Sequence, residues 1–244
     1  MSHSIDEILR DWPYDPDEVH VRLLTAADGR EVLQMRLDMG LLQLETTGRP
    51  DGEHPGGAET YFDFLLAKAS HAGDGFTLSE EQCNEIDREF VQFYHRRICW
   101  LALKNYHQAV SDADHSLELM DFCKEHSPEE SWTLSHEQYR PFVLFHRTQA
   151  ASLAAVEDEQ QEAAVQEINA GLERMLAVFR EYEAEDRFEE DELVKRLIEL
   201  REALRERFNV GRTLEEQLDD AVAAEKYELA AELRDQLRRR SGQH

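Results

Sequence analysis

Arginine, aspartate and histidine side chains stand close together in one loop-like segment, where they could bind a ligand or catalyse a reaction. Arg49, Asp51 and His54 lie in residues 47–57, a stretch rich in glycine and proline. Functional residues often lie on loops of this kind beside a sheet, so the Gly40–Gly57 region is where an enzyme or a ligand-binding protein would have its site. The same side chains also suit a turn that bonds to its own backbone. We favour this structural interpretation and assign no catalytic residues.

A second group of potential ligands is His107, Asp112, Asp114 and His115. On one helix the two histidines are too far apart to share a metal ion, and the two aspartates point to different sides. The spacing therefore predicts neither a metal site nor a cofactor.

The overall charge limits the classes of partner. The 244 residues include 53 acidic and 27 basic side chains, and the formal net charge is −26. A field of this sign repels phosphate backbones, so we expect no direct binding to nucleic acid. Three cysteines without a Cys-x-x-Cys pair indicate a reducing compartment. An acidic N-terminus and the lack of a long apolar run favour a cytoplasmic protein without a membrane span.

The elements that position these residues are mostly helices. Glycine (11) and proline (6) are scarce, which argues against a β-protein with many tight turns. The clearest strand pattern covers residues 19–47, where apolar and polar residues alternate on both sides of a turn at 27–29. The alternation changes phase after Gly40, which indicates either a β-bulge or a third strand.

From residue 79 onward the apolar spacing is typical of helices. Ser79 with Gln82 forms a capping box, and Ser135 with Gln138 is expected to open another helix. The predicted helices cover residues 79–104, 106–125, 136–157, 160–183 and 187–209.

Residues 94–114 resemble one tetratricopeptide (TPR) helix pair. The resemblance rests on Leu103, Tyr106 and Ala109 at the expected turn, where a small residue lets two helices approach and an aromatic ring fills the corner. Residues 147–172 are similar to a degenerate second copy. We predict a TPR-like antiparallel helical bundle, with a generic α-bundle as the alternative.

The C-terminal segment has the pattern of a helical hairpin. Thr213 with Glu216 forms a capping box, and apolar residues then recur at helical spacing over residues 214–222. The pattern breaks near residues 225–226 and restarts over residues 227–237. Two short helices are therefore expected to fold back on each other.

This hairpin resembles the UVR domain, the interaction motif shared by the excision-repair proteins UvrB and UvrC and found in ClpC-type chaperones. The resemblance rests on Leu214, Leu218, Ala221, Val222, Glu225, Tyr227-Glu228, Ala230-Ala231 and Leu233-Arg234-Asp235. In that family two hairpins pair as a four-helix bundle, which implies binding to another protein or to a second copy of this chain. The implied partner-binding residues are Leu214, Leu218, Val222, Tyr227, Ala230, Ala231, Leu233, Arg234 and Leu237. The alternative is a hairpin that simply packs on the preceding helices.

These patterns together predict a mainly α protein in three parts. Residues 1–75 would form a small β/loop unit with short helices, residues 76–210 a TPR-like bundle, and residues 211–244 the UVR-like hairpin. Residues 41–52 also resemble bacterial proteins that end in this motif. The expected function is that of a protein–protein interaction adaptor or regulator. The alternative is an enzyme or ligand-binding protein that uses the Gly40–Gly57 region.

Overall fold

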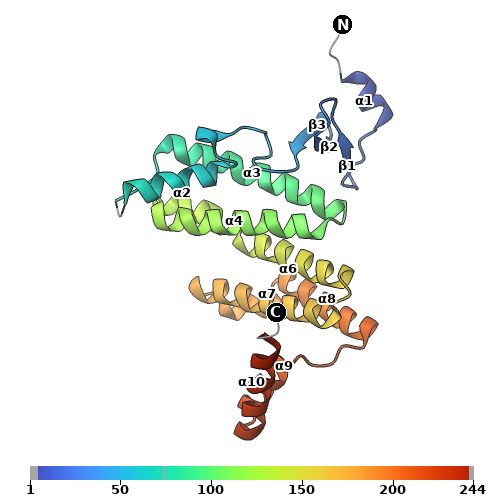
Figure 1. The fold of residues 1–244 in the computed structure, drawn as a ribbon, viewed down its shortest axis with the longest axis vertical. Coiled ribbons are helices and arrows are strands. Elements are labelled where there is room, and N and C mark those ends of the chain that lie inside the picture. Colours follow the sequence, from blue (N-terminus) through green and yellow to red (C-terminus); the bar gives the residue numbers. More distant parts are fainter. Residues whose placement is uncertain (1–4, 74, 242–244) are drawn as a thin grey trace. The chain divides into compact units, whose positions relative to one another are not determined.

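The computed structural model describes residues 5–73 and 75–241, and the chain is mainly α with one small antiparallel sheet near its N-terminus (Figure 1). The chain divides into two compact units, Met1–Ala151 and Ser152–His244, and the boundary falls within helix α6 (Arg140–Glu157). The expected division at residues 75/76 and 210/211 stays a prediction.

The N-terminal unit begins with helix α1 (Asp6–Asp11) and three strands, β1 (Val21–Thr25), β2 (Glu31–Leu37) and β3 (Gly40–Glu45). The strands are antiparallel neighbours in chain order. The phase change after Gly40 is therefore a third strand, because Leu37 pairs with Gly40 across a tight turn. Of the two predicted possibilities, a third strand is confirmed and a β-bulge is not found at this position.

One face of the sheet packs on helices. Leu33 and Leu44 from the sheet share an apolar cluster with Cys99, Trp100 and Ala109. These residues lie near the end of helix α3 (Glu80–Ala102) and the start of helix α4 (Tyr106–His126). The alternating strand pattern thus buries its apolar side against the α3–α4 pair.

Helix α2 (Tyr61–Ala72) completes the core of this unit together with α3 and α4. Thr60 caps α2, because its hydroxyl accepts a hydrogen bond from the backbone N–H of Asp63. The capping box of Ser79 and Gln82 at the start of α3 is confirmed. The cluster between the three helices includes Phe62, Leu65, Ile86, Leu119 and Phe122.

The expected helix over residues 136–157 is wrong at its start. Helix α5 (Glu130–Glu137) contains Ser135, and α6 begins only at Arg140. Gln138 donates its side-chain amide to the backbone carbonyl of Ser135 and makes no capping box with it. Pro141 has no N–H to donate, so it is tolerated only in the first turn of a helix. A new helix therefore starts immediately before this proline.

The C-terminal unit continues with helix α7 (Gln161–Glu181), a 3-10 turn (Glu185–Glu190) and helix α8 (Glu192–Phe208). Helix α8 starts later than the predicted residue 187, because Asp191 is its cap. The carboxylate of Asp191 accepts hydrogen bonds from the backbone N–H groups of Leu193 and Val194. Two further helices, α9 (Leu214–Ala223) and α10 (Tyr227–Ser241), follow.

A common turn ends several of these helices. In the described part of the chain, the non-glycine residues with positive φ all lie at helix ends, and each is followed by an N–H that bonds to the carbonyl five residues earlier. This hydrogen bond is typical of a Schellman cap, in which the helix ends at a residue with left-handed backbone conformation. The left-handed residues are Lys104, Glu159, Glu183, Asn209 and Glu225.

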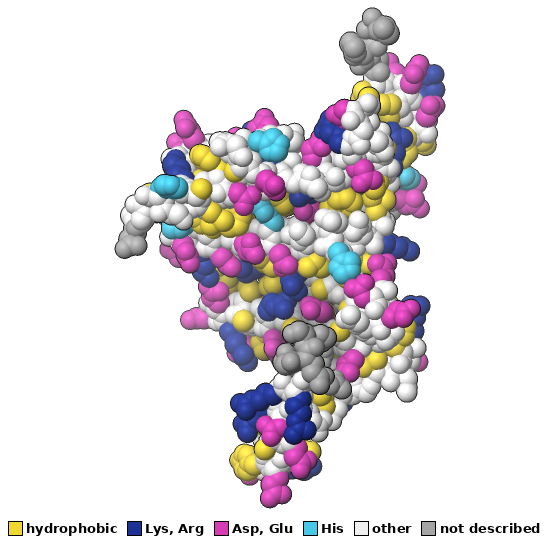
Figure 2. All heavy atoms as spheres, in the orientation of Figure 1, with side chains coloured by type: hydrophobic (Ala, Val, Ile, Leu, Met, Phe, Trp, Pro, Cys, Tyr) yellow, Lys and Arg dark blue, Asp and Glu magenta, His cyan; other side chains and the backbone are white. Residues whose placement is uncertain are grey.

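Acidic side chains are spread over the face of the molecule that Figure 2 shows. Among residues 5–73 and 75–241, no helix has the length and apolar character needed to cross a membrane.

Candidate functional site

The C-terminal hairpin forms where the sequence predicts it. Helices α9 and α10 are joined by Ala224, Glu225 and Lys226. The capping box at its start is confirmed, since the N–H of Glu216 donates to the Thr213 hydroxyl at 3.3 Å and the N–H of Thr213 donates to the Glu216 carboxylate at 2.7 Å. This local order fixes the direction in which α9 leaves the preceding chain.

The two helices of the hairpin meet along a seam of small and branched apolar residues. Ala221, Ala230 and Leu233 are buried in it, and Ala230 is only 9% exposed. Leu214 and Leu218 pack against this cluster but remain partly exposed. The two alanines, Ala221 and Ala230, allow the helix backbones to approach closely. We call these five residues the hairpin seam.

The remaining predicted partner-binding residues lie outside the seam. Tyr227 is 69% exposed and Val222 is 53% exposed. Tyr227, Ala231 and Arg234 follow one another at helical spacing, so they share one side of α10. Ala231 is half-buried, and Arg234 is exposed. Leu237 is half-buried as well. The nine predicted partner-binding residues therefore fall into two groups, one in the hairpin seam and one on the surface beside it.

An ion pair ties the hairpin to the helix before it. Arg205 of α8 pairs with Glu216 of α9. Burial raises the pKa of Glu216, but the hydrogen bonds from Thr213 and Arg205 outweigh it, and the pKa is lowered from its ordinary value. Glu216 is therefore a structural carboxylate that joins the capping box to α8.

The charge of the hairpin differs from that of the rest of the chain. Residues 211–244 carry eight acidic and six basic side chains, whereas the whole chain has a net charge of −26. The hairpin is therefore close to neutral. Its approach to an acidic partner, including a second copy, meets less repulsion than that of a segment with the average charge of the chain.

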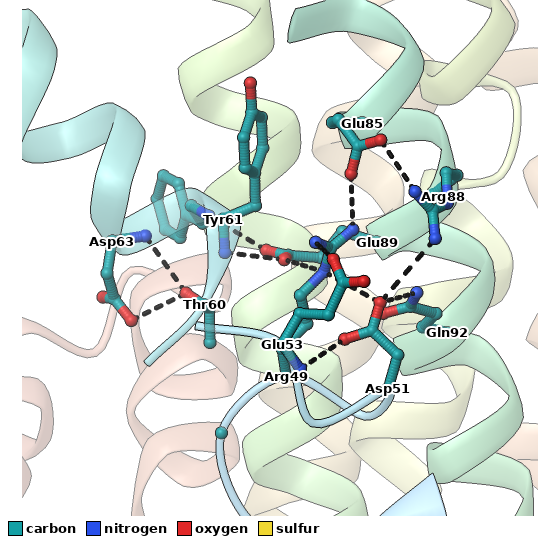
Figure 3. A network of polar contacts seen from close by, with 12 residues as sticks. Arg49, Asp51, Glu53, Thr60, Tyr61, Asp63, Glu85, Arg88, Glu89 and Gln92 are labelled. Atoms are coloured by element: carbon teal, nitrogen blue, oxygen red, sulfur yellow. Dashed lines mark hydrogen bonds and ion pairs between the residues drawn. The ribbon is translucent and has the colours of Figure 1, made fainter. Parts of the chain in front are cut away.

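The loop that would have held an enzyme site is anchored in the protein interior by a buried side chain, while most of its other residues are exposed. The Arg49 side chain is buried, and its guanidinium lies 3.3 Å from Glu89 and 2.9 Å from Glu85 (Figure 3). Asp51 accepts a hydrogen bond from the Gln92 side chain at 2.7 Å. His54 is exposed, just before a short 3-10 turn.

Glu89 connects this loop to two helices. Its carboxylate accepts hydrogen bonds from the backbone N–H groups of Tyr61 and Phe62, at 2.7 and 3.0 Å, and so stabilises the start of α2 (Figure 3). His115 of α4 lies 3.1 Å from the same carboxylate. The network supports a structural interpretation of Arg49, because its charge is compensated by carboxylates that also hold the fold.

The histidines and aspartates considered as metal ligands make other contacts. Asp112 pairs with Arg96 at 2.7 Å, and Asp114 pairs with Arg147 at 2.7 Å. His115 contacts Glu89, as described above. In the described ranges, no group of three or more histidine, cysteine or carboxylate side chains is arranged to hold a metal ion.

Two buried charged residues of one helix were not among the predicted site residues. Glu89 and Arg97 are both in α3, and both are almost fully buried. The available signal was their position among the apolar residues of one helix, close to Ile86 and Phe93. A charge on the apolar side of a helix calls for a buried partner or a ligand, but the sequence does not name that partner.

The comparison with known families identifies the hairpin. Residues 211–240 match the family described as the UvrB/uvrC motif, or UVR, which confirms the predicted resemblance. The UVR motif is an interaction motif, and this chain carries it on a formed helical hairpin. Searches of curated proteins and of solved structures found no match to the chain.

Proposed function

We propose that this protein is an adaptor or regulator that binds another protein through its UVR hairpin. The observation that supports the proposal most directly is the match of residues 211–240 to the UVR family on a hairpin with exposed apolar side chains. Tyr227 and Val222 expose the apolar surface that a partner would cover, and the partly exposed Leu214 and Leu218 extend it. Large, rigid aromatic residues of this kind often dominate binding energy at interfaces.

The partner in this proposal is a second hairpin, from another protein or from a second copy of the chain. Two hairpins that pair as a four-helix bundle would bury the open side of each seam, which a single hairpin leaves partly exposed. The near-neutral charge of residues 211–244 favours such an approach. We further propose a cytoplasmic location and a scaffold role for the helices, with the α3–α4 pair as a TPR-like unit around the buried Ala109.

Replacing Tyr227 with glutamate tests this proposal. We expect Tyr227→Glu to weaken association at least about tenfold, because the substitution removes an aromatic contact and places a charge in a surface that must be desolvated. Sedimentation equilibrium of the full-length protein measures self-association. Capture from a cell extract by immobilised full-length protein measures binding to other proteins.

Tyr182→Glu is the matched control, because Tyr182 is exposed at the end of α7, outside the hairpin. It should leave association unchanged. The proposal fails if Tyr227→Glu associates as the parent protein does, or if the two substitutions weaken association equally.

The chain's charge gives a separate prediction about nucleic acid. We expect no binding to duplex DNA with submicromolar affinity at about 150 mM salt, because a net charge of −26 opposes contact with phosphates. Fluorescence anisotropy of a labelled duplex measures this. Submicromolar binding that weakens steeply as salt is raised would contradict the prediction.

A further inference from the structure

A cavity of about 640 Å³ opens between the helices of the N-terminal unit. Helix α3 forms one side, α4 another, and α5 with the start of α6 closes the remainder. Its walls are mainly apolar and aromatic, with Phe90, Tyr94, Tyr139 and Phe142 among the lining residues. The volume lies in the range of small-molecule sites, which are concave, mostly apolar and equipped with a few polar groups.

An acid, Asp87, and a base, Arg97, are among the residues that line this cavity, and the Asp87 carboxylate already contacts His136 at 2.9 Å. The group that an acidic ligand would pair with is Arg97. It lines the cavity, yet only 2% of the residue is exposed. The guanidinium donates to the Ser116 hydroxyl at 3.1 Å and to His146 Nδ1 at 3.4 Å. Within the described residues, no carboxylate lies at ion-pair distance from it. The neighbouring Arg96 is also buried, but it has such a partner in Asp112.

In the part of the chain that the structure describes, Arg97 is therefore a buried cation without an ion-pair partner of its own. The Asp112 carboxylate, which pairs with Arg96, still favours its charge from farther away. Burial lowers the pKa of Arg97 to about 10, so its side chain is still charged at neutral pH. Hydrogen bonds to a neutral hydroxyl and an imidazole satisfy two donors but do not neutralise the charge. A buried charge is costly unless an opposite charge pairs with it.

We propose that this cavity binds a small organic acid with an aromatic body, whose carboxylate pairs with Arg97 beside Ser116. A carboxylate matches the planar donor geometry of a guanidinium, and the aromatic walls match a flat apolar body. A ligand of this class would supply the carboxylate at ion-pair distance that Arg97 lacks among the described residues. The proposal is independent of the hairpin and of its partner.

Isothermal titration of the full-length protein with 2-naphthoate and with its neutral amide, 2-naphthamide, tests the proposal. We expect the acid to bind and the amide to bind at least about tenfold more weakly, because hydrogen bonds to a charged group contribute more than those between neutral groups. Equal affinity for both compounds, or no binding of the acid at millimolar concentration, would overturn the proposal.

Arg97→Met then tests the role of the cation. The substitution should weaken binding of 2-naphthoate at least about tenfold without lowering the melting temperature, since an apolar side chain of similar length replaces a buried charge that has no ion-pair partner of its own. Arg88→Met is the matched control, because Arg88 is an exposed arginine on the same helix. Arg88→Met should leave the affinity unchanged. Undiminished binding by Arg97→Met would contradict the assignment.

A second pair of variants keeps the test decisive if Arg97→Met does not fold. Val91 lines the cavity and is 55% exposed, so either charge is tolerated there. Val91→Glu should bind 2-naphthoate several-fold more weakly than Val91→Lys, because a negative charge at the opening repels the acid. An equal affinity of the two variants would show that no anion enters by this route and would overturn the proposal.

Discussion

Glu89→Leu is expected to lower the free energy of unfolding of the N-terminal unit by about 3–5 kcal/mol, because it removes the most deeply buried of the carboxylates that pair with the buried Arg49. Arg49 lies 3.3 Å from Glu89, and both side chains are buried. The same substitution removes the acceptor for the backbone N–H groups of Tyr61 and Phe62 at the start of α2. Urea unfolding followed by tryptophan fluorescence measures the loss, since Trp12, Trp100 and Trp132 all lie in this unit.

Glu53→Gln is the matched control for this prediction. Glu53 is also a partner of Arg49, at 3.5 Å, but its side chain is 64% exposed. Exposed ion pairs contribute at most about 1 kcal/mol, so this variant should unfold almost as the parent protein does. Similar losses for the two variants would show that burial of Glu89 does not govern the stability of the network.

The second large effect concerns the hairpin seam. Ala230→Glu is expected to destabilise α9 and α10 by several kcal/mol, because the new carboxylate would have to be buried between them. Helical circular dichroism should fall, and binding through the hairpin should be lost. Tryptophan fluorescence should report an unchanged melting transition, since the tryptophans lie in the other unit.

Ala223→Glu provides the comparison within the hairpin, because Ala223 is exposed at the end of α9. It should cost no more than about 1 kcal/mol, mainly through the charge at a helix C-terminus. If Ala230→Glu leaves the circular dichroism intact, the seam is not closed in solution. If it lowers the melting temperature reported by tryptophan, the hairpin stabilises the whole chain.

Local signals made most of the elements predictable. The capping boxes of Ser79 and Thr213 depend on residues three positions away, and both form as expected. The side-chain alternation indicated either a bulge or a third strand after Gly40, and the pairing of β2 with β3 decides for the strand. The start of α6 differs from the predicted residue 136, because Pro141 lacks an N–H group and is accommodated in the first turn of the helix.

The buried charges could not be derived in the same way. The partners of Glu89 are backbone groups of residues 61 and 62 and the side chains of residues 49 and 115, so the network exists only once the fold has formed. The cavity beside Arg97 likewise requires α5, an element that the apolar pattern did not reveal. In the hairpin, spacing identified the apolar residues, but burial was needed to separate the seam from the surface.

The short left-handed turns have a consequence for how the chain folds. Helix α3 is separated from α4 by residues 103–105, and α9 from α10 by residues 224–226. Closing such short loops costs little chain entropy, and contacts between sequence neighbours favour rapid folding. Both helices of each pair are neighbours in the sequence, so the pair can form without segments that lie farther along the chain. A chain emerging during synthesis can therefore bury apolar surface pair by pair, without keeping it exposed until the last residue has been added.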